Sequence, residues 1–383
     1  MFNVETLNNI DTRTLPKTYQ ITDEKQADAI LLRSEKLHDR KFNPDVAYIG
    51  RAGAGVNNIP LDRCSEEGIV VCNAPGANAN GVKELVLMSM ILASRNVLDA
   101  IEWTKGLKGQ DNIASKVETG KKNFVGHELR GKKIGVVGLG SIGGRVANMC
   151  VSLGMTVYGF DPFVTLRSAW GVDSRVIYTE DKETLFTECD FVSIHIPFTK
   201  DNENIIDADT LALAKEGLTL INMARDGLVD LNALKPLLES GKIAQYIVDF
   251  PEEATLNMPN TINIPHLGAS TPESQANAAQ MVIQQMDDFL KNGNITNSVN
   301  YPDVSLGVCK TAGRVTLCHK NIPNMLTQIL ATMTNRDFNI ANMANKHKNG
   351  WAYTIVDTDN EIDNTLIKEL KAIDGVVRVR QIK

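Results

Sequence analysis

The stretch GVVGLGSIGGRVA, residues 135–147, limits the possible folds of this chain more than any other feature. It begins in a short apolar run rich in β-branched residues, 133–137, and continues into apolar residues at helical spacing, so it predicts a strand, a tight turn and a helix. Gly138 allows the turn, Gly140 lets the backbone approach a pyrophosphate, and Gly143 lets helix and strand pack closely. The free N–H groups at the start of the helix favour an anion there.

A second predicted strand follows the helix and ends in an acidic residue. Residues 155–160 form this strand, and Asp161 comes at the distance where a carboxylate accepts the ribose hydroxyls of NAD and repels the extra phosphate of NADP. We therefore predict NAD as the cofactor, with an ordinary structural turn as the alternative. The residues expected around it are Gly138, Gly140, Ser141, Ile142, Gly143 and Asp161.

Composition narrows the function classes. The chain has 383 residues, enough for two or three domains, and a net charge of −6, which argues against nucleic-acid binding and requires a local basic cluster for any anionic substrate. It shows neither a signal-peptide pattern nor an apolar run of membrane-spanning length, so a cytoplasmic protein without a membrane partner is expected. The six cysteines have no CxxC spacing, which favours reduced thiols over disulfides or a metal site.

Strand and helix patterns alternate along the chain, which predicts an α/β fold with two doubly wound domains, flavodoxin-like and Rossmann, and a ligand in the cleft between them. The predicted strands include residues 29–33, 46–50, 69–72, 190–196, 218–222, 244–249 and 261–264, and the predicted helices include 82–95 and 231–239. After a loop at 291–302, the order from residue 314 is βαββαβ, which indicates a ferredoxin-like third domain.

Polar residues that could carry chemistry follow three of the predicted strands. They are Arg225, the pair Glu252 and Glu253, and His266. Oxidation of a 2-hydroxy acid needs a base, which histidine can supply near neutral pH, and a cation for the carboxylate, which the arginine fork suits. A carboxylate beside the imidazole would orient it and raise its pKa. Ordinary surface or capping roles for these residues are the alternative.

At these residues the chain resembles the D-isomer-specific 2-hydroxyacid dehydrogenases over about its first 300 residues. The signatures are residues 135–147, 192–197, 221–230 and 264–271. The resemblance implies an NAD-dependent dehydrogenase with Arg225 on the substrate carboxylate, His266 as acid–base group and Glu253 as its partner, while Glu252 remains open because the segment after Asp249 is one residue short. It further implies a cofactor cleft lined by His195, Ala224, Asp249 and Gly268, with His195 not transferring the proton.

The stretch at residues 48–58 and the third domain narrow the resemblance to family members that oxidise 3-phosphoglycerate to 3-phosphohydroxypyruvate at the start of L-serine biosynthesis. The implied substrate residues are Arg33, Ser34, Arg51, Ala52 and Gly53. The implied domains are a discontinuous substrate-binding domain, 1–96 and 271–303, an NAD-binding domain, 97–270, and an ACT regulatory domain, 312–383. The alternatives are a hydroxypyruvate or glyoxylate reductase and, with less support, an NAD(H)-sensing binding protein like the co-repressors of this fold.

The ACT resemblance implies regulation by a bound amino acid. His319, Asn321 and Asn339 match positions that bind L-serine in inhibited members, although the domain could serve only to pair subunits of a homodimer or homotetramer.

Two residues depart from the family pattern. Asp226 stands where a glycine is usual beside the arginine, and Asn324 stands where a glycine is common.

Overall fold

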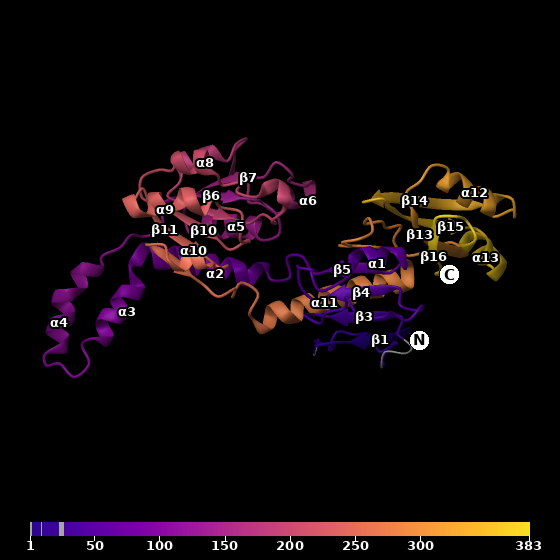
Figure 1. The fold of residues 1–383 in the computed structure, drawn as a ribbon, viewed down its shortest axis with the longest axis horizontal. Coiled ribbons are helices and arrows are strands. Elements are labelled where there is room, and N and C mark those ends of the chain that lie inside the picture. Colours follow the sequence, from indigo (N-terminus) through magenta and orange to yellow (C-terminus); the bar gives the residue numbers. More distant parts are fainter. Residues whose placement is uncertain (1, 9, 23–26) are drawn as a thin grey trace. The chain divides into compact units, whose positions relative to one another are not determined.

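The computed structural model describes residues 2–8, 10–22 and 27–383, and it divides the chain into two units (Figure 1). Unit 1 holds residues 1–77 and 275–383, and unit 2 holds residues 78–274. The sequence placed the corresponding boundaries at 96 and 271. The first difference arises because helix α2 (Ala79–Arg95) packs through Val82, Val86 and Met90 against the core of unit 2.

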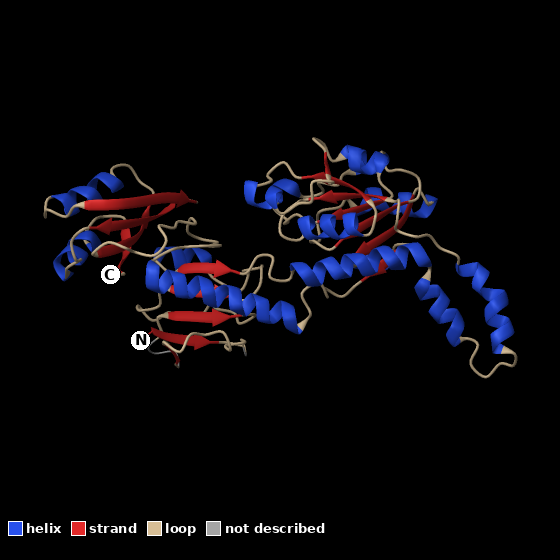
Figure 2. Ribbon diagram, turned by 180° about the vertical axis from the view of Figure 1, so that it is seen from behind, coloured by secondary structure: helices blue, strands red, loops and turns tan. Residues whose placement is uncertain are grey.

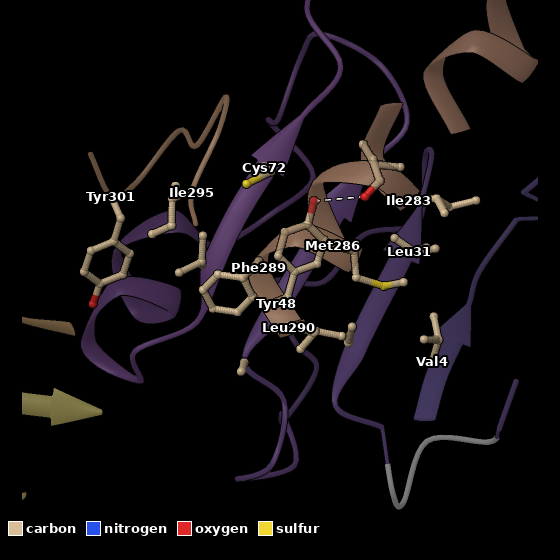
Figure 3. Packing of buried hydrophobic residues seen from close by; sticks show 14 of the residues in the cluster. Val4, Leu31, Tyr48, Cys72, Ile283, Met286, Phe289, Leu290, Ile295 and Tyr301 are labelled. Atoms are coloured by element: carbon tan, nitrogen blue, oxygen red, sulfur yellow. Dashed lines mark hydrogen bonds between the residues drawn. The ribbon is translucent and has the colours of Figure 1, made fainter. Parts of the chain in front are cut away.

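The first sheet of unit 1 is parallel, with the strand order β2-β1-β3-β4-β5 of flavodoxin-like folds. Its elements are β1 (Phe2–Thr6), β2 (Tyr19–Ile21), β3 (Ala29–Leu32), β4 (Tyr48–Arg51), β5 (Val70–Asn73) and the helices α1 (Leu61–Glu66) and α11 (Pro272–Asn292). The core lies between the sheet and α11, where Leu31 and Tyr48 meet Met286 and Phe289 (Figure 3). The Tyr48 hydroxyl donates to the carbonyl of Val282, 3.2 Å away.

The second sheet of unit 1 is antiparallel and confirms the predicted ferredoxin-like order (Figure 2). Its elements are β13 (Gly313–Lys320), α12 (Met325–Thr334), β14 (Ile340–Lys348), β15 (Trp351–Thr358), α13 (Asn364–Lys371) and β16 (Val376–Gln381), and the strand order is β14-β15-β13-β16. Leu317, Ile329 and Leu366 are among the buried residues between the sheet and its helices. That this fold acts as an ACT regulatory domain stays a prediction.

Polar contacts, most of them buried, join the antiparallel sheet of unit 1 to the end of α11 and the loop that follows it. Arg314 is fully buried, donates from Nε and Nη2 to both oxygens of Asp357 at 2.5 and 2.8 Å, and donates from Nη1 to the carbonyls of Asn292 and Gly307. The Tyr353 hydroxyl also donates to the carbonyl of Gly293 at 2.8 Å. The end of α11 is therefore held by side chains of the antiparallel sheet.

Unit 2 contains a seven-stranded parallel sheet in the order β12-β11-β10-β9-β6-β7-β8, which confirms the predicted Rossmann arrangement. Its strands are β6 (Lys133–Val137), β7 (Thr156–Phe160), β8 (Ile177–Tyr178), β9 (Phe191–Ile194), β10 (Leu218–Asn222), β11 (Ile243–Val248) and β12 (Thr261–Asn263). Its further helices are α3 (Val97–Lys105), α4 (Ile113–Gly120), α5 (Gly143–Ser152), α6 (Leu166–Trp170), α7 (Glu183–Glu188), α8 (Ala208–Ala212), α9 (Leu231–Ser240) and α10 (Glu253–Leu256).

Two local features of unit 2 were not predicted. Helices α3 and α4 have no buried residue and extend away from the sheet of their unit (Figure 1). The two ends of unit 2 are also adjacent, because a β-carbon placed on Gly81 would lie 3.1 Å from the hydroxyl oxygen of Ser274. The chain thus enters and leaves this unit at neighbouring points.

The cysteines and the helices can be compared with the sequence analysis. All six cysteines are free thiols, and only Cys309 is not buried. Within the described part of the chain, no helix combines the length and the apolar character that crossing a lipid bilayer requires.

Candidate active site

The glycine turn after β6 has the geometry that a bound pyrophosphate requires. Gly138 adopts a left-handed φ of 88°, and a β-carbon there would lie 2.8 Å from the carbonyl oxygen of His195. A β-carbon on Gly143 would lie 1.8 Å from the carbonyl oxygen of Gly138, so helix and strand are as close as glycine allows. A β-carbon on Gly140 would meet no atom within 4 Å, so this backbone is open to a ligand.

Asp161 is held beside this turn by backbone hydrogen bonds. One carboxylate oxygen accepts the N–H of Leu139 at 2.8 Å and the other accepts the N–H of Phe163 at 2.9 Å. The acidic residue at the end of β7 is therefore fixed against the loop that leads through Ser141 and Ile142 into α5. A glycine cradle with a fixed carboxylate at its side fits the pyrophosphate and ribose of NAD.

Gly140 and Gly143 allow a matched pair of variants, one expected to affect NAD binding and the other stability. We expect Gly140→Ala to weaken NAD binding about tenfold or more and to leave the free energy of unfolding unchanged, because its methyl group would occupy only the ligand's space. Gly143→Ala should lower the free energy of unfolding by about 1–3 kcal/mol, because its methyl group must displace a backbone oxygen. Calorimetric NAD titration and urea unfolding measure both effects, and unaltered NAD affinity in Gly140→Ala would contradict the assignment.

Arg225 lies on a rigid turn directly after β10. The amide of the buried Asn222 donates to the Arg225 carbonyl at 2.8 Å and accepts the N–H of Ala224 at 3.1 Å. The Arg225 guanidinium in turn donates to the Ala224 carbonyl at 2.7 Å. Asn222 was missed as a functional residue, because from the sequence it reads only as the last residue of a strand.

Asp249 organises the loop that carries His266. Its two carboxylate oxygens accept the N–H groups of Leu267 and Gly268 at 2.7 and 2.9 Å, and its carbonyl accepts the N–H of His266 at 3.0 Å. Burial raises the pKa of this carboxyl group, and the two backbone donors oppose that shift. His266 adopts a left-handed φ of 53°, a strained conformation for a non-glycine residue that this loop sustains.

Phe250 brings Arg225 and His266 together. The guanidinium carbon of Arg225 lies 5.3 Å from the centroid of the Phe250 ring, and the imidazole centroid of His266 lies 4.5 Å from the same centroid. A cation and an imidazole thus surround one aromatic side chain at the carboxyl edge of the sheet, where such folds bind ligands. The position of Phe250 directly after Asp249 was the one signal in the sequence that could have identified it.

Neither candidate glutamate is hydrogen-bonded to His266 among the residues that the structure describes. Both are exposed, and the main-chain N–H of Glu252 donates to the hydroxyl of Thr255 at the start of α10. Burial, followed by the charge of Asp226, raises the pKa of Glu252. Glu253 as the partner of His266 stays a prediction, with Glu252 as its alternative.

His195 is the second histidine at this edge, and its chemistry differs from that of His266. Its Nε2 atom lies 2.9 Å from the hydroxyl of Ser193, and burial lowers the pKa of the imidazole to about 3. It is therefore neutral at physiological pH and unsuited to return a proton there. That His195 lines the cofactor cleft without transferring the proton stays a prediction.

The predicted substrate residues form a basic edge in unit 1. Arg51 is the last residue of β4 and pairs in register with Leu32, the last residue of the adjacent parallel strand β3, which Arg33 follows directly. A β-carbon on Gly53 would lie 1.8 Å from a guanidinium nitrogen of Arg51, so this arginine folds across the glycine. Ala52 between them is buried.

Two asparagines support the loops of this basic edge. Asn8 accepts the N–H groups of Ser34 and Glu35 at 3.0 and 2.7 Å, and Asn73 donates from its amide to the carbonyl of Ala54 at 2.6 Å. Neither was predicted from the sequence, because a single asparagine carries no pattern that reveals its hydrogen-bonding partner.

The three predicted regulatory residues differ in their accessibility. His319 is buried, and its ring nitrogens each lie 2.8 Å from an oxygen, the carbonyl of Lys320 and the hydroxyl of Thr354. Asn321 and Asn339 are exposed. Asn324 adopts a φ of 63°, so it takes the left-handed conformation for which glycine is common at this turn.

Comparison with known proteins adds to this geometry. Residues 87–268 match the family described as D-isomer specific 2-hydroxyacid dehydrogenase, NAD binding domain. The chain is 33% identical to the D-3-phosphoglycerate dehydrogenase of Haemophilus influenzae over 88% of its own length and 81% of that protein. It is 35% identical to the enzyme of that name from Bacillus subtilis over 72% of its length, and there it spans about half of the relative, 52%.

A solved structure agrees with these relatives. The NAD⁺-bound 3-phosphoglycerate dehydrogenase of Entamoeba histolytica is 26% identical, with a TM-score of 0.57, over 78% of this chain and 98% of that one. The matches confirm the predicted enzyme class, an oxidoreductase of the dehydrogenase type, and NAD as its cofactor. Identity and coverage together establish that the chain belongs to the D-isomer specific 2-hydroxyacid dehydrogenase family.

Proposed function

We propose that the chain catalyses the NAD-dependent oxidation of D-3-phosphoglycerate to 3-phosphohydroxypyruvate, the first step of L-serine biosynthesis. The observation that carries this proposal is the placement of Arg225 and His266 around Phe250, at the carboxyl edge of the sheet that bears the NAD turn. The names of the relatives from Haemophilus influenzae and Bacillus subtilis support the choice of substrate.

The proposed mechanism assigns one task to each side chain. Arg225 binds the substrate carboxylate through its fork of N–H donors and orients the 2-hydroxyl group. His266 accepts the hydroxyl proton and returns it in the reverse direction. The glycine turn and Asp161 would hold NAD, which would supply the acceptor for the hydride from the same carbon. Asp249 positions the loop that carries His266, in addition to its predicted place in the cofactor cleft.

The basic edge of unit 1 supplies the discrimination for phosphate. We expect Arg51→Gln to lower kcat/KM for 3-phosphoglycerate by about 10- to 100-fold, because a charge-assisted contact to the substrate phosphate is lost. The reaction of D-glycerate, which has no phosphate and is expected to be much slower, should not change. Arg13→Gln serves as the matched control, because Arg13 is an exposed arginine that pairs with Asp11 and lies outside the basic edge. NADH formation measures both substrates.

Two other outcomes would favour a different function for this chain. Efficient turnover of glycerate or reduction of glyoxylate that is indifferent to Arg51→Gln would favour a hydroxypyruvate or glyoxylate reductase. A chain that binds NADH but turns over none of these substrates would favour the NAD-sensing binding protein.

We further propose L-serine as an effector of the antiparallel domain, in a cytoplasmic homodimer or homotetramer. The exposed amide of Asn321 supports this proposal, since it can bind a polar end of an amino acid. Asn339 is also exposed, and its amide nitrogen donates to a carboxylate oxygen of Asp359. His319 fits the role less well, because both of its ring nitrogens already have partners within the sheet. Light scattering gives the assembly state, and NADH formation with and without L-serine tests inhibition.

A further inference from the structure

A cavity of about 1080 Å³ lies in unit 1, where β16 approaches the first sheet. Three of its basic residues come from the antiparallel domain, one from the loop between β3 and β4, and one from helix α1. The five are Lys371, Arg378, Arg380, Lys41 and Arg63. We call this cavity, as lined by these five residues, the basic pocket. It shares no residue with the basic edge formed by Arg33 and Arg51 or with the NAD turn.

The two arginines of β16 form no direct ion pair within the described residues, although the charges of Asp45 and Glu67 act on Arg378 and that of Asp28 acts on Arg380. Arg378 donates three of its five N–H groups, all to carbonyl oxygens of Glu67 and Pro44 at 3.0–3.3 Å. Arg380 donates two, to the carbonyls of Phe289 and Leu290 at 3.1 and 3.2 Å. Burial lowers the pKa of both guanidinium groups. Each keeps unused donors, and carbonyl dipoles offset only part of the charge of these half-buried guanidinium groups.

The carboxylates of the pocket do not balance its cations. Asp28, Asp45 and Glu67 face five basic side chains. Asp28 already accepts the N–H of Asn3 at 2.7 Å, and Glu67 lies 3.9 Å from Arg63. Lys41 and Lys371 are exposed, come from the two sides of the pocket and form no ion pair within the described part of the chain. The net charge of the lining therefore favours an anion with more than one negative charge.

We propose that the basic pocket binds a small phosphate-bearing anion, which joins β16 to the loops of the first sheet. A phosphate group accepts hydrogen bonds from arginine forks and lysine ammonium groups together, and two or more negative charges would complement the excess of cations. The volume leaves room for an organic residue attached to the phosphate. Because the anion would contact both domains of unit 1, it would tighten their association. This proposal does not depend on the dehydrogenase activity.

Amide hydrogen exchange of the full chain, with inorganic phosphate as the probe and ionic strength held constant with chloride, tests the proposal. We expect phosphate to slow exchange in residues 376–381 and 41–47 of the wild-type protein. The double variant Lys41→Gln with Lys371→Gln should need about tenfold more phosphate for the same protection, because both lysines are exposed and their loss spares the fold. Lys310→Gln, which removes an exposed charge outside the pocket, should behave as wild type.

The location of the protection separates this site from the proposed substrate site. Phosphate bound only at the basic edge would protect residues 51–55 and leave 376–381 unchanged, which would overturn the proposal. Equal protection of 376–381 in the wild type and in the double variant would also overturn it. Arg378→Gln provides a further check, since it should abolish the phosphate effect at 376–381 even at high phosphate, provided that its circular dichroism matches the wild type.

Discussion

Replacement of His266 by asparagine is expected to lower kcat for 3-phosphoglycerate oxidation by about 10²- to 10⁴-fold, the usual contribution of a general base. NAD affinity should change little, because the glycine turn and Asp161 lie elsewhere on the sheet. In the wild type, kcat/KM for oxidation should fall as the pH decreases, since a protonated imidazole cannot accept the hydroxyl proton. Stopped-flow NADH formation and NAD titration measure the two quantities, and normal turnover in His266→Asn would exclude this residue as the base.

Two further histidines provide controls for this experiment. Burial keeps the pKa of His195 at about 3, so its imidazole does not titrate between pH 5 and 9, and His195→Asn should leave the acid limb of the profile in place while altering the KM for NAD. His127→Asn changes an exposed residue and should leave all parameters as in the wild type. Loss of the acid limb in His195→Asn would reverse the roles proposed for the two histidines.

Asp357→Asn is expected to destabilise unit 1 by about 3–5 kcal/mol, because it leaves the fully buried charge of Arg314 without its carboxylate. Urea unfolding followed by tryptophan fluorescence would show the loss. Asp363→Asn is the matched control, since its pair with Arg336 is partly exposed and should contribute less than about 1 kcal/mol.

A double variant distinguishes an unpaired charge from lost packing. Arg314→Met with Asp357→Leu removes both charges, and the free energy of unfolding should recover most of what the single variant loses. If Asp357→Asn proved no more harmful than Asp363→Asn, the buried ion pair between β13 and β15 would not stabilise unit 1 as its burial indicates.

Much of the fold could be predicted from patterns of apolar and polar residues that are close together in the sequence. The strands at 133–137 and 218–222 were predicted to the residue, because apolar runs between glycines or polar residues identify buried parallel strands. The βαββαβ order of the third domain followed in the same way. Helices α3 and α4 were missed, since both begin at left-handed asparagines without a side-chain cap and bury no residue.

The residues that position Arg225 and His266 could not be predicted, because they act through contacts between residues that are distant in the sequence. The sequence singled out Arg225 and His266 but not Phe250, which contacts both, nor Asn222, which fixes the turn of Arg225. It also proposed His319 as a ligand residue without indicating that the imidazole is buried between Lys320 and Thr354. Residue type indicates what a side chain can do, whereas burial decides whether a ligand reaches it.

The adjacent ends of unit 2 have a consequence for the order of folding. The core of unit 1 needs contacts such as Tyr48 with Phe289, so its two segments must meet across about 200 intervening residues, at a loop-closure cost in conformational entropy. Once unit 2 has folded, Gly81 and Ser274 are neighbours, and that long loop is already closed. During synthesis the inserted unit 2 can fold first and keep the two segments of unit 1 close to each other. Variants that slow the folding of unit 2, such as Gly143→Ala, should then also delay unit 1, although they lie outside it.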